Sequence, residues 1–276
     1  MDTPHVSVGR KFSKTMNRID RKFQELKKKK KKALIVYLTV GYPNVATTEE
    51  LVSELSQAGV DMFELGVPFS DPLADGPVIQ EASTFALKHH VNLDSVFFLA
   101  KRLRKEIDKP LIVMGYYNPI LSYGLERFAI SAKLSGLDGV IVPDLPMEES
   151  RELRAILNKY KMHLIDFVAP TTDSSRIKKI AKTSKGFIYY VSLTGVTGIR
   201  DKLPKGIINR LNYLKRTVKT PICVGFGISG KQQFKYITKY CDGAIVGSAI
   251  IKKIRENLGN KNLVSKVVSF TKSLIP

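Results

Sequence analysis

The sequence predicts an α/β fold, a closed (β/α)8 barrel, and two observations carry this prediction. From residue 33 onwards, short apolar, β-branched runs alternate with amphipathic helical segments, which indicates a parallel sheet with right-handed crossovers. Eight such runs occur, which favours a barrel over an open sheet. The competing doubly wound sheet needs a glycine-rich turn of the GxGxxG type after its first strand, and "VGYPN" (40–44) is not one.

The first 32 residues form a basic segment ahead of the barrel. Met16, Ile19, Phe23 and Leu26 recur at helical spacing and predict a short capping helix, which runs into six consecutive lysines at 27–32. Such a charge run is usually solvated. The segment resembles neither a secretory signal nor a transit peptide, and we do not expect it to belong to the core.

The predicted strands lie between loops rich in glycine, proline or aspartate. Their ranges are 33–40, 61–65, 110–116, 139–142, 163–169, 186–192, 221–226 and 243–247. Predicted helices include 47–59, 125–136, 148–160 and 174–184, and an extra helix at 94–107 precedes the third strand. Thr47 or Thr48 is expected to cap the first of these, and Gly59 and Gly136 to follow helix ends in left-handed conformations. We expect residues 1–276 to form one domain, with the barrel at 33–276.

The composition limits the classes of function. No apolar run reaches the ~18 residues of a membrane span. Cys223 and Cys241 have no neighbours at metal-ligand spacing, which predicts reduced, buried thiols and no metal site. The net charge of +20 suggests nucleic-acid binding, but the excess is mostly lysine, partly local, and typical of an AT-biased genome. We therefore expect no nucleic-acid partner.

An acid stands inside the second predicted strand, "DMFEL" (61–65). Because side chains alternate along a strand, Met62 and Glu64 share one face and Phe63 and Leu65 the other. Large apolar side chains belong under the outer helices, so Glu64 is expected to point into the barrel. Partial desolvation there raises a carboxyl pKa towards neutrality and suits it to proton transfer. The alternative is a structural ion pair inside the barrel.

The loop that follows, "GVPFSDPLADGP" (66–77), contains Asp71 and Asp75. Its prolines restrict the backbone, so the loop is stiff enough to hold Asp75 over the barrel mouth. Two carboxylates in different environments can serve as separate acid and base. The alternatives are an Asx turn or helix cap for either aspartate, and a surface contact for Asp71.

Glycines follow the last three predicted strands, in "SLTGVTGI" (192–199), "VGFGISG" (224–230) and "VGSAI" (246–250). Glycine lets backbone N–H groups approach an anion, and a helix N-terminus adds a favourable dipole. The loops after strands seven and eight of a barrel commonly bind phosphate. A phosphate cradle opposite carboxylates predicts proton-transfer chemistry on a small phosphorylated metabolite. The alternative is glycines that serve the turns alone.

The segment "ELGVPFSDPLADGPVIQ" (64–80) closely resembles the signature of the tryptophan synthase alpha chain family. "YLTVGYPN", "MGYYNPI", "GVIVPDLPMEES", "YYVSLTGVTGIR", "VGFGIS" and "VGSAII" also resemble that family in order and spacing, whereas the lysine run lies outside the similarity. The resemblance implies a barrel lyase that cleaves indole-3-glycerol phosphate to indole and glyceraldehyde 3-phosphate. It implies no cofactor or metal in this chain, and a beta chain partner that carries pyridoxal phosphate in an α2β2 tetramer and turns indole into tryptophan.

The resemblance also implies residue roles. Glu64 matches the acid–base that protonates C3 of the indole ring, and Asp75 the carboxylate that stabilises positive charge on the indole nitrogen. Asp71 and the segment 116–119 match the partner-facing surface. The substrate-binding positions are Tyr189 near the glutamate, Tyr116 and Phe226 beside the indole, Thr197 closing onto Asp75, and the phosphate binders Gly198, Gly227, Gly247 and Ser248.

Two other functions are compatible with parts of this pattern. Another phosphate-binding barrel, such as indole-glycerol-phosphate synthase or a sugar-phosphate isomerase, would need a lysine or paired aspartate at strand ends, and the second and third strands have no such lysine. A basic binding protein would show salt-dependent nucleic-acid affinity and no need for Glu64. The net charge is higher than is typical of the family, which is compatible with a plastid-encoded protein of the stroma or with the cytoplasm of a low-GC bacterium.

Overall fold

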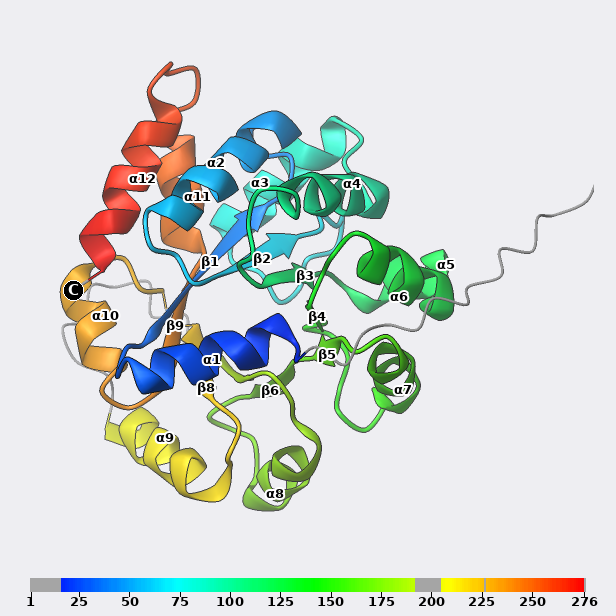
Figure 1. Ribbon diagram of the computed structural model, residues 1–276, viewed down its shortest axis with the longest axis vertical. Coiled ribbons are helices and arrows are strands. Elements are labelled where there is room, and N and C mark those ends of the chain that lie inside the picture. Colours follow the sequence, from blue (N-terminus) through cyan, green and yellow to red (C-terminus); the bar gives the residue numbers. More distant parts are fainter. Residues whose placement is uncertain (1–15, 192–204, 226, 276) are drawn as a thin grey trace, which may run out of the picture.

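The computed structural model describes residues 16–191, 205–225 and 227–275. Its strands form one parallel sheet in the order β5-β4-β3-β2-β1-β9-β8-β7-β6, with helices around it (Figure 1). The strands are β1 (Ala33–Thr39), β2 (Met62–Gly66), β3 (Leu111–Met114), β4 (Gly139–Ile141), β5 (His163–Leu164), β6 (Asp166–Val168), β7 (Ile188–Val191), β8 (Ile222–Gly225) and β9 (Gly243–Val246). The predicted barrel is confirmed.

The fifth predicted strand is divided into β5 and β6 at Ile165. β5 pairs with β4, whereas β6 pairs with β7, so the strand changes partner within three residues. Because β5 and β6 stand at opposite ends of the strand order, the chain between them joins the two edges of the sheet and closes the barrel.

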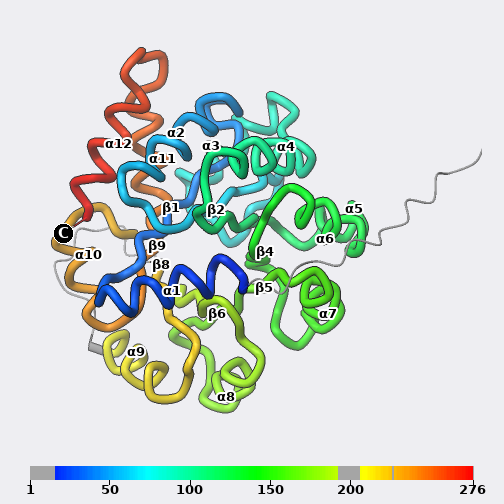
Figure 2. Tube along the Cα trace, viewed as in Figure 1, coloured from blue at the N-terminus to red at the C-terminus, as the bar shows by residue number. Residues whose placement is uncertain are grey.

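Helices cover the outside of the barrel and one of its ends, as the chain trace shows (Figure 2). They are α1 (Arg18–Lys28), α2 (Val45–Gln57), α3 (Pro77–Lys88), α4 (Leu93–Leu103), α5 (Tyr117–Tyr123), α6 (Leu125–Leu134), α7 (Arg151–Lys159), α8 (Ser174–Thr183), α9 (Lys205–Thr217), α10 (Lys231–Ile237), α11 (Ser248–Arg255) and α12 (Leu263–Leu274). The extra helix expected before the third strand is α4.

The ends of these helices test the local predictions. The predicted cap of α2 is wrong, because the helix begins earlier: Asn44 Oδ1 accepts the Thr47 N–H at 2.7 Å, and Thr48 is buried inside the first turn. Asparagine is among the strongest capping residues, and it stands just before the segment that we predicted. Gly59 and Gly136 have φ angles of +102° and +83°, as predicted for residues after helix ends.

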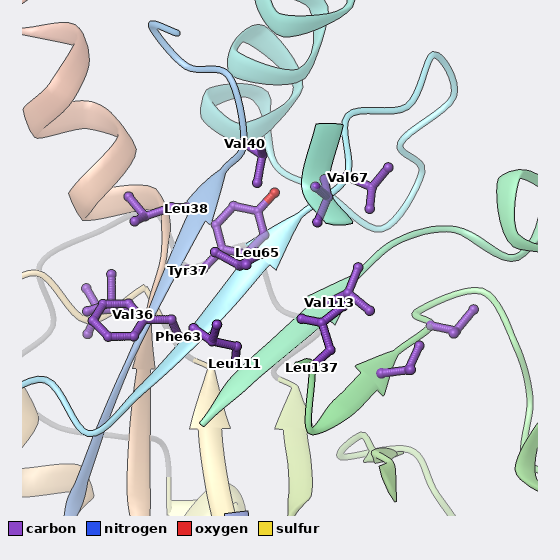
Figure 3. Close-up of a cluster of buried hydrophobic side chains, with 14 of the residues drawn as sticks. Val36, Tyr37, Leu38, Val40, Phe63, Leu65, Val67, Leu111, Val113 and Leu137 are labelled. Atoms are coloured by element: carbon purple, nitrogen blue, oxygen red, sulfur yellow. The ribbon is translucent and has the colours of Figure 1, made fainter. Parts of the chain in front are cut away.

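The apolar core has two layers, one under the helices and one inside the barrel. Phe63 and Leu65 belong to the outer layer. Figure 3 shows the part of this layer to which β1, β2 and β3 contribute. Met62 packs inside the barrel with Ile35 and Ile112. The predicted orientation of β2 is therefore confirmed. The thiols of Cys223 and Cys241 are free and buried, also as predicted.

Helix α1 closes the end of the barrel where the strands begin. Ile19, Phe23 and Leu26 are buried and join the cluster inside the barrel. A Cβ on Gly139, at the start of β4, would lie 3.0 Å from Ile19 Cδ1, so the helix rests directly on the strand ends (Figure 1). The expectation that the N-terminal segment lies outside the core is wrong, because an open barrel end would expose interior apolar side chains that α1 covers.

Candidate active site

A cavity of about 530 Å³ lies at the opposite end, where the strands finish. This is within the size range of small-molecule sites. Five of the residues singled out in the sequence line this one cavity: Asp75, Tyr189, Gly227, Gly247 and Ser248. Phe226, Thr197 and Gly198 lie outside the described residues. Glu64 and Tyr116 do not line the cavity, but each has a neighbour that does. Tyr116 donates a hydrogen bond to Asp75, and Glu64 lies beside Tyr37 in the adjacent strand.

Glu64 points into the barrel from β2 and is completely buried. Neither carboxyl oxygen has a hydrogen-bond partner among the described residues. Burial raises the pKa of this carboxyl to about 8, because no nearby charge or donor offsets the cost of ionising it. The sequence analysis predicted that this pKa would rise, but it expected the carboxyl to be only partly desolvated. The protonated form therefore prevails at neutral pH.

Two tyrosines form the floor of the cavity next to Glu64. Tyr37 stands beside Glu64 in the β1–β2 register, and Figure 3 shows it between these two strands. Burial and, among smaller causes, the charge of Glu64 raise the pKa of both Tyr37 and Tyr189. Each phenol therefore stays protonated. Both line the cavity, so Glu64 lies directly behind its floor.

Each floor tyrosine leans over a glycine of the next strand. A Cβ on Gly66 would lie 2.3 Å from the Tyr37 hydroxyl oxygen, and a Cβ on Gly225 would lie 2.6 Å from that of Tyr189. Real Cβ atoms do not approach this closely, so the two glycines make room for the rings. The sequence analysis missed Tyr37. The available signal was its spacing from Ile35, which places both on the inner face of β1.

Asp75 is held over the cavity by Tyr116. The Tyr116 hydroxyl donates to Asp75 Oδ2 at 3.0 Å and accepts the Ala74 N–H at 2.9 Å, so one side chain fixes the loop twice. The ring of Tyr116 also stacks on Phe69 at a centroid distance of 5.1 Å. Burial raises the pKa of Asp75 to about 6, and the Tyr116 hydrogen bond opposes this shift. Asp75 is therefore mostly ionised at neutral pH, unlike Glu64.

The glycine-rich end of the cavity faces the start of α11. Gly247 is the N-cap of this eight-residue helix and Ser248 its first residue, and both line the cavity. The first N–H groups of a helix have no partner within it, so they are available to an anion there. A Cβ on Gly247 would lie 3.3 Å from Tyr37 Cβ, which leaves little space for a side chain. Gly227 has a φ of +53°, and a Cβ there would meet nothing within 4 Å. This end can accept an anion without a lysine or arginine.

Comparison with known proteins agrees with this geometry. The family model for the tryptophan synthase alpha chain matches residues 23–274. The tryptophan synthase alpha chain of Caldanaerobacter subterraneus subsp. tengcongensis is 42% identical over 259 residues, which cover 94% of this chain and 98% of the relative. That of Carboxydothermus hydrogenoformans is 45% identical over 253 residues, 92% of this chain and 95% of the relative.

Solved structures give the same result. Tryptophan synthase subunit alpha from Legionella pneumophila superimposes with a TM-score of 0.88 at 36% identity, over 94% of this chain and 97% of that one. A chain from the tryptophan synthase α2β2 complex of Pyrococcus furiosus has a TM-score of 0.83 at 36% identity, over 88% of this chain and 97% of that one. With the family model spanning nearly all of the barrel, the chain belongs to the tryptophan synthase alpha chain family.

Proposed function

We propose that Glu64 and Asp75 divide the chemistry of the family's reaction between them. The chain is a carbon–carbon lyase that cleaves indole-3-glycerol phosphate into indole and glyceraldehyde 3-phosphate. In this family pyridoxal phosphate is carried by the beta chain, and the alpha chain has no cofactor. Acid–base groups of the protein must therefore carry the cleavage.

Glu64 is the proton donor to C3 of the indole ring. Its pKa of about 8 keeps it protonated at neutral pH. Protonation of C3 places a positive charge on the ring nitrogen, which the ionised carboxylate of Asp75 stabilises. The glyceryl hydroxyl next to C3 then loses its proton, the carbonyl of the aldehyde forms, and the electrons of the broken carbon–carbon bond return to the ring. Transfer of that hydroxyl proton to the ionised Glu64 restores the starting state.

One observation carries this assignment: a single cavity joins Asp75 to the start of α11, with Glu64 directly behind its floor. The phosphate of the substrate binds at Gly227, Gly247 and Ser248, and the indole ring lies towards the floor tyrosines. Two carboxylates near one ring hold different protonation states at the same pH, which is the arrangement that separates an acid from a stabilising charge.

The test is indole release by the Glu64→Gln and Asp75→Asn variants. Both changes keep the shape of the side chain, so we expect a normal far-ultraviolet circular dichroism spectrum and a fall in kcat of at least about 100-fold for Glu64→Gln. Glu54→Gln, on the exposed face of α2, is the matched control and should keep full activity. Wild-type turnover in Glu64→Gln would refute the role given to this residue.

We propose that the beta chain docks over the mouth of the cavity. Exposed residues support this: Leu73 is 93% exposed, and Asp71, two residues before it, is exposed as well. Leu121, in α5 after the third strand, is 53% exposed. Large apolar side chains at such exposure are suited to burial by a partner. Indole release measured with and without a beta chain tests this. Leu121→Asp, at a residue that does not line the cavity, should abolish any stimulation by the beta chain without lowering the activity of the isolated chain.

We further propose that residues 1–276 form a single domain, with the barrel at 33–276. We place it in the cytoplasm of a bacterium or in the stroma of a plastid. No helix in the described part of the chain is long and apolar enough to cross a membrane. The curated relatives named above come from bacteria, which supports the first location, and the lysine-rich composition is compatible with either. Subcellular fractionation of the source cells, followed by immunodetection of the chain, distinguishes them.

A further inference from the structure

A second cavity, of about 360 Å³, lies at the closed end of the barrel, beside the last turn of α1. Phe23, Leu26 and Pro221 give it an apolar floor. Its other lining residues are Lys27, Lys30, Lys31, Lys32, Lys219 and Asp242. Five lysines thus face one carboxylate around a concave, partly apolar surface far from the active-site mouth.

Among the residues that the structure describes, only one of these lysines makes a hydrogen bond or ion pair through its amino group. Lys32 Nζ donates to the Cys241 carbonyl at 2.6 Å and lies 3.9 Å from Asp242. The amino groups of the other four have no hydrogen bond or ion pair among the described residues, although Glu25 nearby pairs with Lys22 and Lys29. The acidic groups at this end are therefore already used, and the pocket keeps an excess of free positive charge.

The backbone conformation at position 30 does not favour a lysine. Helix α1 ends in a Schellman motif, in which the Lys31 N–H donates to the Leu26 carbonyl at 2.9 Å and the Lys30 N–H to the Lys27 carbonyl at 3.1 Å. Lys30 has a φ of +54°, where glycine is favoured because it has no Cβ. A charged side chain stands here against the local preference, and it lines the pocket.

We propose that this pocket binds a small polyanion with an aromatic ring, of the nucleoside triphosphate class. Lysine ammonium groups bind phosphates as point charges, and four free ones match a chain of phosphates. The apolar floor suits the ring. The cavity is concave and of small-molecule size, whereas the backbone of a nucleic-acid duplex would need an extended basic face.

The experiment is isothermal titration calorimetry of the full chain with ATP, without divalent cations, at low ionic strength. We expect one bound equivalent whose affinity falls as sodium chloride is added. Inorganic tripolyphosphate should bind more weakly than ATP because it lacks the ring, and inorganic phosphate more weakly still. Absence of ATP binding at low salt would overturn the proposal, and equal affinity for tripolyphosphate would overturn the part given to the ring.

Variants locate the site. The double variant Lys30→Gly, Lys219→Gln removes two pocket charges, and its first change also relieves the backbone, so we expect a folded protein with wild-type indole release. ATP affinity should fall about tenfold, since two of the lysine contacts with the phosphates are lost. The control Lys179→Gln, Lys266→Gln removes two exposed lysines from the middle of α8 and α12 and should keep its affinity.

Two further outcomes would contradict the proposal. An equal loss in both double variants would mean that ATP responds to net charge alone. Tighter binding of a short DNA duplex than of ATP, weakened by the same pocket variant, would make this end a nucleic-acid surface instead. The readout is binding at a site separate from the catalytic cavity, so a failure here leaves the roles of Glu64 and Asp75 untouched.

Discussion

The carboxyl of Glu64 is buried in the barrel without a hydrogen-bond partner among the described residues. The free energy of unfolding therefore depends on pH. Its folded pKa of about 8 lies above the ordinary value of 4.5 that the unfolded chain would show. Between these values the folded protein binds more protons than the unfolded chain. The free energy of unfolding contributed by Glu64 therefore falls as pH rises through this window, and the loss is complete above it.

Glu64→Gln should remove this pH dependence, because glutamine does not ionise. We expect the variant to be more stable than the wild type at pH 9 by roughly 2–5 kcal/mol, with the difference shrinking towards pH 4. Urea unfolding at a series of pH values measures this. Asp75→Asn is the comparison: its smaller shift should act only up to about pH 6. Parallel profiles for wild type and Glu64→Gln would show that Glu64 does not titrate as described.

Tyr116 tunes Asp75, and a variant can separate this role from ring contact with the substrate. Tyr116→Phe keeps the stack on Phe69 but removes the hydroxyl that donates to Asp75 and accepts the Ala74 N–H. Because that hydrogen bond lowers the pKa of Asp75, its loss should move the acidic limb of the pH–rate profile above pH 6.

The pH dependence of kcat/KM for indole release tests this second prediction, with Tyr123→Phe as the control. Tyr123 also donates to an aspartate, Asp94, but at the far end of α5. An unchanged acidic limb in Tyr116→Phe would mean that Tyr116 does not act through Asp75.

The sequence was sufficient to place Glu64, because alternation along one strand and two large apolar neighbours decide which way it points. It was not sufficient for Tyr37 or for the grip of Tyr116 on Asp75. The contact between Tyr116 and Asp75 joins segments about 40 residues apart, and Tyr37 meets Glu64 across two adjacent strands. Local periodicity carries no information on which side chains meet in this way.

At the scale of elements, one device fixes the starts of several strands. Asp61, Asp138 and Asp242 each precede a strand, and each accepts a backbone N–H from the first or second residue of a neighbouring strand: Leu34 at 2.9 Å, Leu111 at 3.0 Å and Ile222 at 3.0 Å respectively. Two of these aspartates, Asp61 and Asp138, stand two residues after the glycines that follow helix ends, Gly59 and Gly136. Each of the three aspartates also donates its own N–H to the carbonyl of the same residue whose N–H it accepts, so side chain and backbone together fix the register of the two strands.

Asp138 is the most heavily used of the three. It is 2% exposed and also receives Arg18 and Arg104, each at 3.0 Å. Asp138→Ala removes the carboxylate partner of the largely buried Arg104 guanidinium and the acceptor of the buried Leu111 N–H, so we expect a loss of about 3–5 kcal/mol of unfolding free energy. Asp108→Ala is the matched control, since Asp108 pairs with Arg18 and Arg21 but its side chain is 71% exposed. It should cost below about 1 kcal/mol. Equal losses in urea unfolding would contradict this account.

Element boundaries show what the sequence cannot decide alone. All predicted strands were found, because each is a short apolar run between turn residues. The break at Ile165 follows from closing the barrel, where one strand must pair with neighbours on both sides. The burial of α1 is likewise a tertiary effect: its apolar stripe was visible, but its destination depended on the open barrel end.

At the scale of the whole molecule, the charge is out of balance. The sequence has 45 basic and 25 acidic residues, so the folded chain repels itself electrostatically. Added sodium chloride screens this repulsion, because the Debye length falls from about 30 Å at 0.01 M to about 8 Å at 0.15 M. We expect the melting temperature to rise over this range, measured by differential scanning calorimetry. A steady fall would mean that the attractive ion pairs outweigh the excess charge.

The position of α1 determines how molecules move through the enzyme. Because Ile19, Phe23 and Leu26 fill the end of the barrel where the strands begin, the reaction cavity is closed at that end. Substrate enters and both products depart over the same rim. A protein bound at that rim thus controls the opening left by the described residues, and an apolar product such as indole meets this neighbour before it meets bulk water.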